Sequence, residues 1–219
     1  MNTTIYLIRH SIKYSDNIIL NYHTDQSDRL KREKIILTPL GEVKAKILST
    51  EDELKNIDVV YASNMVRTLQ TAKYLLESQN LKINIDDRLD ERRLGIFNSD
   101  KILNWFELQY ENINYHTEGG ESQLDVRNRM TDAIDEILEK NRGKRVAIFS
   151  HGYAITFYLL KWCKLISVSN THHLKIGYKD KIIVDKILDA PEVFKIVMDQ
   201  NNNPVSIELI EFDDLKNIK

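Results

Sequence analysis

The chain has 219 residues, of which 42% are hydrophobic and 29% charged, enough apolar sequence for one globular domain with a substantial core. Lysine and arginine number 31 against 33 aspartate and glutamate residues, and this near balance gives no overall electrostatic reason to expect nucleic acid as a partner. A single cysteine, Cys163, excludes an intramolecular disulfide and a cysteine-rich zinc site, and we expect it to be a buried thiol on a helix.

The first predicted elements are a strand at residues 3–8 and a helix at residues 37–48. The strand is short, β-branched or aromatic, and apolar rather than alternating, which is typical of a buried parallel strand. In the helix, Thr38 can serve as the N-cap and Pro39 fits the first helical position. Residues 11–36 are polar and charged, and a loop of this length in a compact domain is often a lid or a binding loop.

Two more strands of the same kind are predicted at residues 58–63 and 145–150, and helical patterns follow both. Residues 92–120 mix aromatic residues with Asn and Gly and form a second candidate lid. The helices are expected at 67–78, 121–140 and 153–162, and the apolar side of the long middle one contains Leu124, Met130, Ile134, Ile137 and Leu138.

Near the carboxyl end, the segments 192–199 and 205–212 flank a turn sequence and are predicted to be two strands at a sheet edge. Strands that alternate with helices indicate an α/β fold, here a three-layer sandwich with helices on both sides of a mostly parallel sheet. No internal repeat and no linker rich in Gly, Pro or Ser divides the sequence. We therefore expect a single domain over residues 1–219, with antiparallel strands at its carboxyl end.

The amino terminus lacks the basic segment, apolar stretch and cleavage site of a signal peptide. No apolar run approaches the roughly 20 residues that a membrane span needs. These features predict a cytoplasmic protein without a membrane partner.

Cationic and titratable side chains follow all three predicted parallel strands. Arg9 and His10 follow the first, Ser63 and Arg67 the second, and His151 the third. Ligands of open α/β sheets bind beyond the carboxyl ends of the strands, so we expect these side chains to converge. Guanidinium groups match the oxygens of a phosphoryl group, and a neutral imidazole can attack phosphorus as a nucleophile. The pattern therefore indicates phosphoryl transfer.

Such a reaction also needs an acid that protonates the leaving alcohol oxygen. Asp90 and Glu91 are the candidates, because they stand just before the second irregular stretch. The adjacent His172 and His173 suggest a metal site, but no cysteine or carboxylate cluster flanks them. We expect those two histidines to be exposed to solvent.

Six motifs in this sequence resemble the successive signatures of the histidine phosphatase superfamily, which has the phosphoglycerate-mutase-like fold. The resemblance runs from residue 5 to about residue 156, with the motifs in the family's order and spacing. They are LIRH, LTPLG, YASNMVRTLQTA, LDERRLGIFN, EGGES and FSHGYAI.

The resemblance implies a role for each matched position. His10 would be the nucleophile that becomes phosphorylated, and Glu91 would be the proton donor. Arg9 and Arg67 would bind the phosphoryl group, and His151 would hydrogen-bond its oxygens in the transition state. The family needs no metal ion and no organic cofactor for hydrolysis.

The sequence departs from the family pattern at the rim of the expected pocket. Ser11 stands where the family has a glycine, and Asn17 could only roughly replace the asparagine that contacts phosphate. The usual Trp-Glu-Gly ending is absent after the LDERRLGIFN motif. If the local loop is shifted by one residue, Asp90 rather than Glu91 would be the acid.

The resulting hypothesis is a histidine acid-type phosphatase, a metal-independent phosphomonoesterase that acts on a small phosphorylated metabolite through a phosphohistidine. One alternative is phosphoglycerate-mutase-type phosphoryl transfer. Mutases of the family carry extra basic residues before the EGGES motif, where this chain has only Lys101 and His116. The other alternative is a non-catalytic module that binds a phosphorylated ligand. The sequence does not identify the substrate or the oligomeric state.

Overall fold

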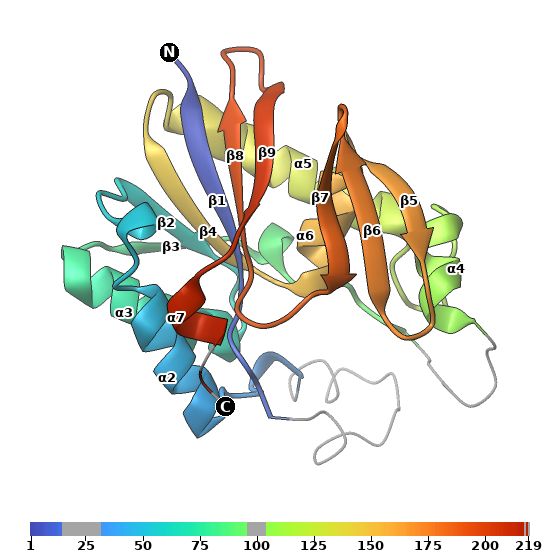
Figure 1. Ribbon diagram of the computed structural model, residues 1–219, viewed down its shortest axis with the longest axis horizontal. Helices are drawn as coiled ribbons and strands as arrows, with labels where there is room; N and C mark the ends of the chain where they lie inside the picture. Colours follow the sequence, from blue (N-terminus) through green and yellow to red (C-terminus); the bar gives the residue numbers. More distant parts are fainter. Residues whose placement is uncertain (15–31, 96–103, 217, 219) are drawn as a thin grey trace.

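The strands predicted at residues 3–8, 58–63 and 145–150 are present and lie next to one another in one sheet. The computed structural model describes residues 1–14, 32–95, 104–216 and 218. The strands of this sheet are β1 (Thr3–Arg9), β2 (Val59–Ala62), β3 (Ile83–Ile85), β4 (Arg145–Ser150), β8 (Val193–Met198) and β9 (Pro204–Ile210). Their order is β3-β2-β4-β1-β8-β9 (Figure 1). The first four are mutually parallel, and β8 and β9 extend the sheet at one edge through antiparallel pairing, as predicted.

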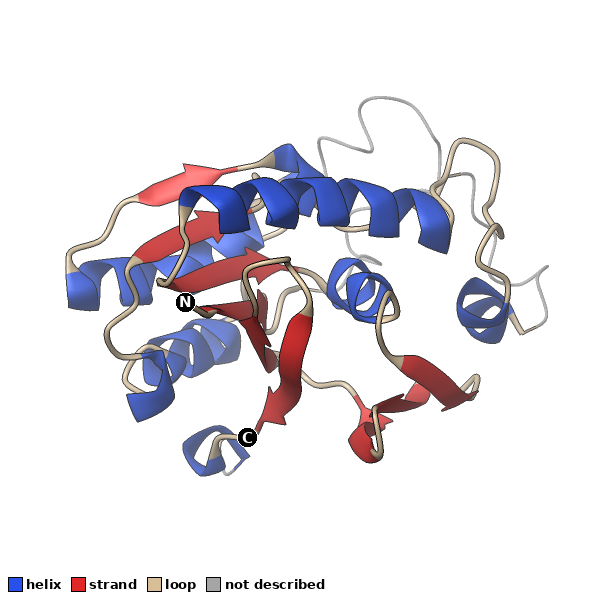
Figure 2. Ribbon diagram, turned by 90° about the horizontal axis from the view of Figure 1, so that it is seen from above, coloured by secondary structure: helices blue, strands red, loops and turns tan. Residues whose placement is uncertain are grey.

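Helices cover both faces of this sheet (Figures 1 and 2). They are α2 (Pro39–Leu48), α3 (Val66–Gln79), α4 (Trp105–Glu111), α5 (Gln123–Lys140), α6 (Gly152–Leu159) and α7 (Asp213–Lys216), with short 3₁₀ turns at Asp52–Leu54 and Asp87–Leu89. Side chains of a strand alternate between its faces, and in β1 Ile5 and Leu7 join the core formed with α5 and α6. Tyr6 and Ile8 join the opposite core, with α2 and α3. This confirms the three-layer α/β fold.

The helix termini follow the signals in the sequence. Thr38 is the N-cap of α2, where its side chain accepts from Gly41 N, and Pro39 is the first helical residue. Helix α5 starts with a capping box, in which the side chain of Ser122 accepts from Asp125 N and the side chain of Asp125 accepts from Ser122 N. One expectation was wrong: Leu124, in the first turn of α5, is 36% exposed, because at 3.6 residues per turn it lies at the edge of the predicted apolar side. The other four residues of the predicted apolar side are buried.

The segment after β1 is held against α2. Thr38 N donates to Ile12 O at 2.9 Å, and the Thr38 hydroxyl reaches the same carbonyl at 3.3 Å. Gly41 passes so close to Ile12 O that a Cβ at this position would collide with it. A glycine is therefore required here, and the contact fixes the backbone that leaves the end of β1.

A second sheet was not predicted. It comprises β5 (Lys164–Val168), β6 (His173–Tyr178) and β7 (Lys181–Ile187), all antiparallel, and lies beside α4 and α6 (Figure 1). The helix expected at 153–162 ends at Leu159, since the chain turns there to enter β5. Cys163 is buried as expected, but it lies in the bend before β5 rather than on a helix. None of the helices in the described part of the chain is long and apolar enough to cross a membrane.

Candidate active site

His10 follows the last residue of β1 and is almost fully buried, with 3% of its surface exposed. Its backbone N–H continues the parallel ladder by donating to Ser150 O at 3.0 Å. The ring nitrogen Nδ1 lies 2.7 Å from Ser11 O. Because a carbonyl oxygen can only accept, this contact assigns the ring proton to Nδ1 and leaves a lone pair on Nε2.

His151 follows β4 and lies against His10, with the two ring centroids 5.1 Å apart. Its Nε2 is 2.8 Å from the hydroxyl of Ser63, the residue that follows β2. That hydroxyl is in turn 2.9 Å from the Thr68 hydroxyl on α3. The residues after three neighbouring strands therefore meet at one edge. The sequence placed Ser63 at this edge without a role, and the structure shows that it orients His151.

Two guanidinium groups lie at the same edge of the sheet. Arg9, at the end of β1, donates from Nη1 to Leu188 O at 3.1 Å and to Asp189 O at 2.9 Å. Arg67, in the first turn of α3, is 4% exposed and donates from Nη1 to Arg32 O at 2.9 Å. These contacts with backbone carbonyls hold both cations in fixed orientations.

Both histidines are neutral in this environment. Burial and the guanidinium groups of Arg67 and Arg9 lower the pKa of His10 well below its ordinary value. Burial, Arg67 and the neighbouring His10 ring lower the pKa of His151 in the same way. Two effects act together, because desolvation disfavours a charged imidazole and the nearby cations repel it. A neutral imidazole with a lone pair on Nε2 is the form that acts as a nucleophile.

Several buried polar atoms around His10 lack a hydrogen-bond partner among the described residues. They are Arg9 Nε, the Ser11 hydroxyl oxygen and His151 Nδ1. Burying such an atom without a partner costs roughly 1–3 kcal/mol, so native proteins seldom do so unless a ligand completes the site. All three can donate a hydrogen bond, and an anion with several oxygens matches them. Ser11 therefore adds a hydroxyl where the family pattern has a glycine.

Glu91 lies at the amino end of α6, the helix that begins directly after His151. Its Oε1 accepts hydrogen bonds from Ala154 N at 3.1 Å and from Arg92 N at 2.9 Å. The first turn of a helix has unsatisfied N–H groups that favour a carboxylate. One oxygen of Glu91 is thereby anchored next to the helix start that carries His151.

Asp90 has different surroundings. Its Oδ1 accepts from Asn64 N at 3.3 Å, and the residue is 9% exposed. Burial and the nearby Asp87 carboxylate raise the pKa of Asp90 to about 7. The two neighbouring carboxyl groups therefore contact different segments, because Asp90 contacts the turn before α3 whereas Glu91 contacts α6.

The raised pKa of Asp90 predicts a pH-dependent stability. Between the ordinary value of 3.8 and about 7, the folded chain keeps a proton that the unfolded chain has lost, so stability falls as pH rises through this window. Asp90→Asn stays neutral in both states and should raise the free energy of unfolding, by roughly 2–3 kcal/mol more at pH 8 than at pH 5. Urea unfolding at the two pH values measures this difference. The control is Asp180→Asn, at the exposed turn between β6 and β7, whose effect on the free energy of unfolding should not increase between pH 5 and pH 8. An increase in the free energy of unfolding of Asp90→Asn that is the same at both pH values would contradict the prediction.

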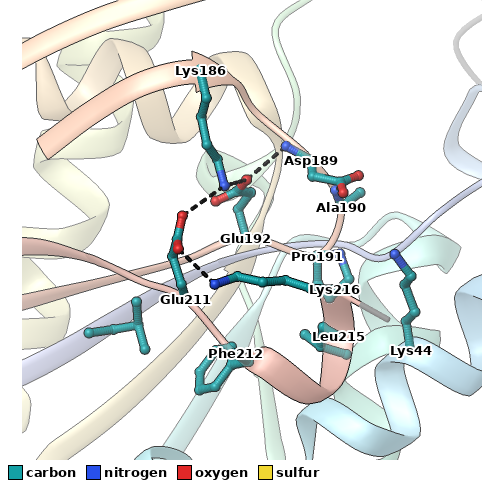
Figure 3. A pocket seen from close by; sticks show the side chains of 11 residues that line it. Lys44, Lys186, Asp189, Ala190, Pro191, Glu192, Glu211, Phe212, Leu215 and Lys216 are labelled. Atoms are coloured by element: carbon teal, nitrogen blue, oxygen red, sulfur yellow. Dashed lines mark hydrogen bonds and ion pairs between the residues drawn. The ribbon is translucent and has the colours of Figure 1, made fainter. Parts of the chain in front are cut away.

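A small pocket lies beside the loop whose carbonyls accept from Arg9 (Figure 3). Glu192 lines it, is 5% exposed, and accepts from Asp189 N at 2.7 Å and from Lys186 Nζ at 3.1 Å. Burial raises the pKa of this carboxyl group. The backbone N–H of Arg9 donates to Glu192 O at 2.8 Å, so the same residue ties the loop to the end of β1. This network fixes the position of the Arg9 guanidinium.

The described residues contain no group of three or more His, Cys, Asp or Glu side chains that could hold a metal ion. His172 is exposed, as expected, and stacks on Phe106 with ring centroids 4.3 Å apart. His173 is half-buried and lies 3.5 Å from Asp185. His172 therefore supports the contact of α4 with the segment before β6, whereas His173 contacts a neighbouring strand of the second sheet.

Asn17 and Lys101 lie outside the described residues. His116 is exposed, and its Nδ1 is 3.0 Å from Thr117 O. One residue to which the sequence assigned no role is deeply buried directly after Glu91: Arg92 is 2% exposed. No sequence signal distinguishes it from the exposed Arg93 that follows it.

Comparisons with known proteins agree with this geometry. The sequence model of the histidine phosphatase superfamily, branch 1, matches residues 5–187. Phosphoserine phosphatase 1 of Hydrogenobacter thermophilus is 28% identical over 149 residues, which cover 64% of this chain and 69% of that protein. A probable phosphoglycerate mutase of Yersinia enterocolitica is 32% identical over 127 residues, which cover 54% of this chain and 59%, less than two thirds, of the relative.

Solved structures share the fold. The mycobacterial glucosyl-3-phosphoglycerate phosphatase aligns with a TM-score of 0.67 at 16% identity, over 97% of this chain and 99% of that chain. Bacillus stearothermophilus YhfR aligns with a TM-score of 0.64 at 21% identity, over 92% of this chain and 94% of that chain. The family match extends over most of the sequence and includes the carboxyl ends of β1, β2 and β4, where the site residues lie. This chain belongs to the histidine phosphatase superfamily, branch 1.

Proposed function

We propose that this protein is a metal-independent phosphomonoesterase that hydrolyses a small phosphorylated metabolite through a phosphohistidine at His10. The observation that carries the proposal is the neutral His10 ring, with Nδ1 bound to Ser11 O, among buried donors on Arg9, Ser11 and His151 that lack partners in the described part of the chain. A lone pair on Nε2 and a set of donors for phosphoryl oxygens are the two features that attack on phosphorus requires.

In the first step, Nε2 of His10 attacks phosphorus while the ester P–O bond breaks. Glu91 donates its proton to the leaving alcohol oxygen, so the products are a free alcohol and phosphohistidine. Arg9, Arg67 and His151 stabilise the equatorial oxygens of the transferring group. When Ser63 donates to Nε2 of His151, the Nδ1–H of that ring is available as one of these donors.

In the second step, water attacks phosphorus and the P–N bond to His10 breaks. The Glu91 carboxylate now accepts the proton of the water, which returns both residues to their starting states. The two guanidinium groups supply the positive charge that metal ions supply in other phosphoryl-transfer enzymes. The reaction as proposed therefore has no step that uses a metal ion or cofactor.

The relatives support a small phosphorylated substrate, since one is a phosphoserine phosphatase, and a phosphoserine phosphatase of the same fold from Entamoeba histolytica has been solved in complex with 3-phosphoglyceric acid. The alternative is return of the phosphoryl group to another hydroxyl, since a probable phosphoglycerate mutase is also among the relatives. A binding module is less well supported, because binding alone does not need the buried neutral His10. The predicted cytoplasmic location is part of this proposal.

Release of phosphate in excess EDTA tests the proposed function. We expect steady turnover of p-nitrophenyl phosphate and of at least one member of a panel of small phosphomonoesters, unchanged by the chelator. A rate that disappears with EDTA and returns with a divalent cation would contradict the metal-free mechanism. Transfer of the phosphoryl group within the substrate without release of phosphate would identify a mutase, and tight phosphate binding without turnover would identify a binding module.

A further inference from the structure

Lys44, on α2, is a buried lysine without a counterion in the described part of the chain. The residue is 8% exposed, and it has neither a hydrogen bond nor an ion pair with any described side chain. Lysine is seldom buried to this extent unless it is paired, because its ammonium group loses hydration. The one acidic residue of α2, Glu42, is already paired with Lys73 at 2.8 Å. The missing partner of Lys44 therefore requires an explanation.

Lys44 lines the pocket beside the loop that holds Arg9, and its side chain extends from α2 toward Ala190 (Figure 3). The cavity has a volume of about 60 Å³. A water molecule needs roughly 10–15 Å³ of such space, so the cavity holds about four to six waters, which is the size of acetate or inorganic phosphate. Part of its wall is apolar and is formed by Pro191, Ile210, Phe212 and Leu215. Apolar walls with a few polar groups are typical of a small-molecule site.

The other lysines of the pocket are paired with its glutamates. Two residues of each type form a chain of ion pairs, in the order Glu192, Lys186, Glu211 and Lys216 (Figure 3). The three successive contacts in this chain measure 3.1, 3.5 and 2.9 Å. The remaining carboxylate, that of Asp189, is exposed to solvent and accepts from Ala190 N at 2.8 Å. The glutamates therefore compensate the charge of the other two lysines, and the charge of Lys44 is left without a partner in the pocket.

The pocket shares a loop with the phosphoryl site but does not share its side chains. Backbone carbonyls of residues 188–192 accept from both the guanidinium group and the backbone N–H of Arg9. None of His10, Arg67 and His151 lines the pocket. A ligand in the pocket would therefore contact the α2 side of the loop, apart from the nucleophile.

We propose that this pocket is a second ligand site, in which Lys44 binds a small oxyanion of the size of a short carboxylate or inorganic phosphate. The ammonium group donates to the oxygens of the ligand, and the ligand supplies the counterion that the fold lacks. Such a pair is stronger in a cavity with apolar walls than in water, because the local dielectric constant is lower. The chain of ion pairs opposite Lys44 keeps the two glutamates paired with lysines when the anion is bound.

Backbone amide signals in NMR spectra distinguish this site from the phosphoryl site within one titration. Inorganic phosphate, added at constant ionic strength, should shift the signals of Ala190 and Leu215 in the pocket as well as that of Ser11 at the phosphoryl site. In Lys44→Gln, the dissociation constant given by the pocket signals should rise about 10- to 100-fold, as expected for loss of a hydrogen bond between charged groups, while the constant given by Ser11 stays the same. The matched control is Lys46→Gln, an exposed lysine of the same helix, which should behave as the wild-type protein does.

A parallel titration with acetate identifies the source of the oxyanion. Tighter binding of acetate than of phosphate at the pocket would support the site and identify its ligand as a carboxylate, and the reverse order would identify phosphate. Pocket signals that shift with neither anion, or that shift equally in Lys44→Gln, would overturn the proposal. If Lys44→Gln does not fold, Lys44→Met replaces it, because its side chain fills similar space without a charge. The titration needs no turnover, so a protein that binds oxyanions in the pocket but hydrolyses no ester would keep this site and reject the phosphatase function.

Discussion

Replacing His10 with alanine is expected to lower kcat for p-nitrophenyl phosphate by at least about 10⁴-fold, because the variant lacks the proposed nucleophile. The neighbouring imidazole cannot substitute for it, since Nε2 of His151 is bound to Ser63 and its ring is fixed in a different orientation. Steady-state release of p-nitrophenolate, measured at enzyme concentrations high enough to detect the residual rate, gives the loss directly.

A second measurement separates loss of the nucleophile from loss of structure. Wild-type enzyme quenched with alkali during turnover of a ³²P-labelled substrate should carry acid-labile label, and His10→Ala should carry none. The control His173→Ala changes a histidine of the second sheet whose side chain is 44% exposed, and it should retain both label and rate. Labelled protein from His10→Ala would show that another residue is the nucleophile.

The convergence of the site residues was predictable because it depends on a short-range signal and a general rule. Each parallel strand is marked by a continuous apolar run, and in this fold class the carboxyl ends of such strands share one edge. Arg9 and His151 therefore meet in the structure although they are 142 positions apart in the sequence (151 − 9). The hydrogen-bonded register of β1 with β4, which pairs Arg9 with Ser150, is what brings them together.

The second sheet was missed because its strands are half exposed and rich in lysine, so they lack the apolar runs of the first sheet. A local signal did exist, because Leu174 and Ile176, both buried, alternate with other residue types in β6. The exposure of Leu124 had a signal too. At 3.6 residues per turn, Leu124 lies at the edge of the stripe formed by the four buried residues of α5.

The contacts that orient the site could not be predicted from the sequence. The bond between Ser63 and His151 joins residues that are 88 positions apart, and either partner alone is an ordinary polar residue. The burial of Arg92 depends on how α4 and α6 pack around it, whereas the next residue, Arg93, is exposed. Tertiary packing decides whether each arginine is buried or exposed, and the residue type alone does not show it.

Two criteria for the general acid point to different residues: the pKa favours Asp90, whereas the position of the carboxyl group favours Glu91. The pKa of Asp90, about 7, suits a proton donor at neutral pH, but its carboxyl group is bound to Asn64 N before α3. Glu91 is anchored to Ala154 N, three residues beyond His151, and a general acid must first of all reach the oxygen that it protonates. The geometry therefore favours Glu91, and the two variants Glu91→Gln and Asp90→Asn should behave differently.

Glu91→Gln is expected to lower kcat for alkyl phosphates by about 10²- to 10⁴-fold, the usual contribution of general acid–base catalysis. With p-nitrophenyl phosphate, whose leaving group needs little protonation, the same variant should release one equivalent of nitrophenolate in a fast burst. Slow turnover should follow, because water must then attack phosphohistidine without a base. Asp90→Asn should show neither the burst nor the dependence on the leaving group. The reverse pattern, with the burst in Asp90→Asn alone, would identify Asp90 as the residue that protonates the leaving group. Glu91, anchored at α6, would then take no part in the proton transfer, and the loop that carries Asp90 would have to rearrange when substrate binds.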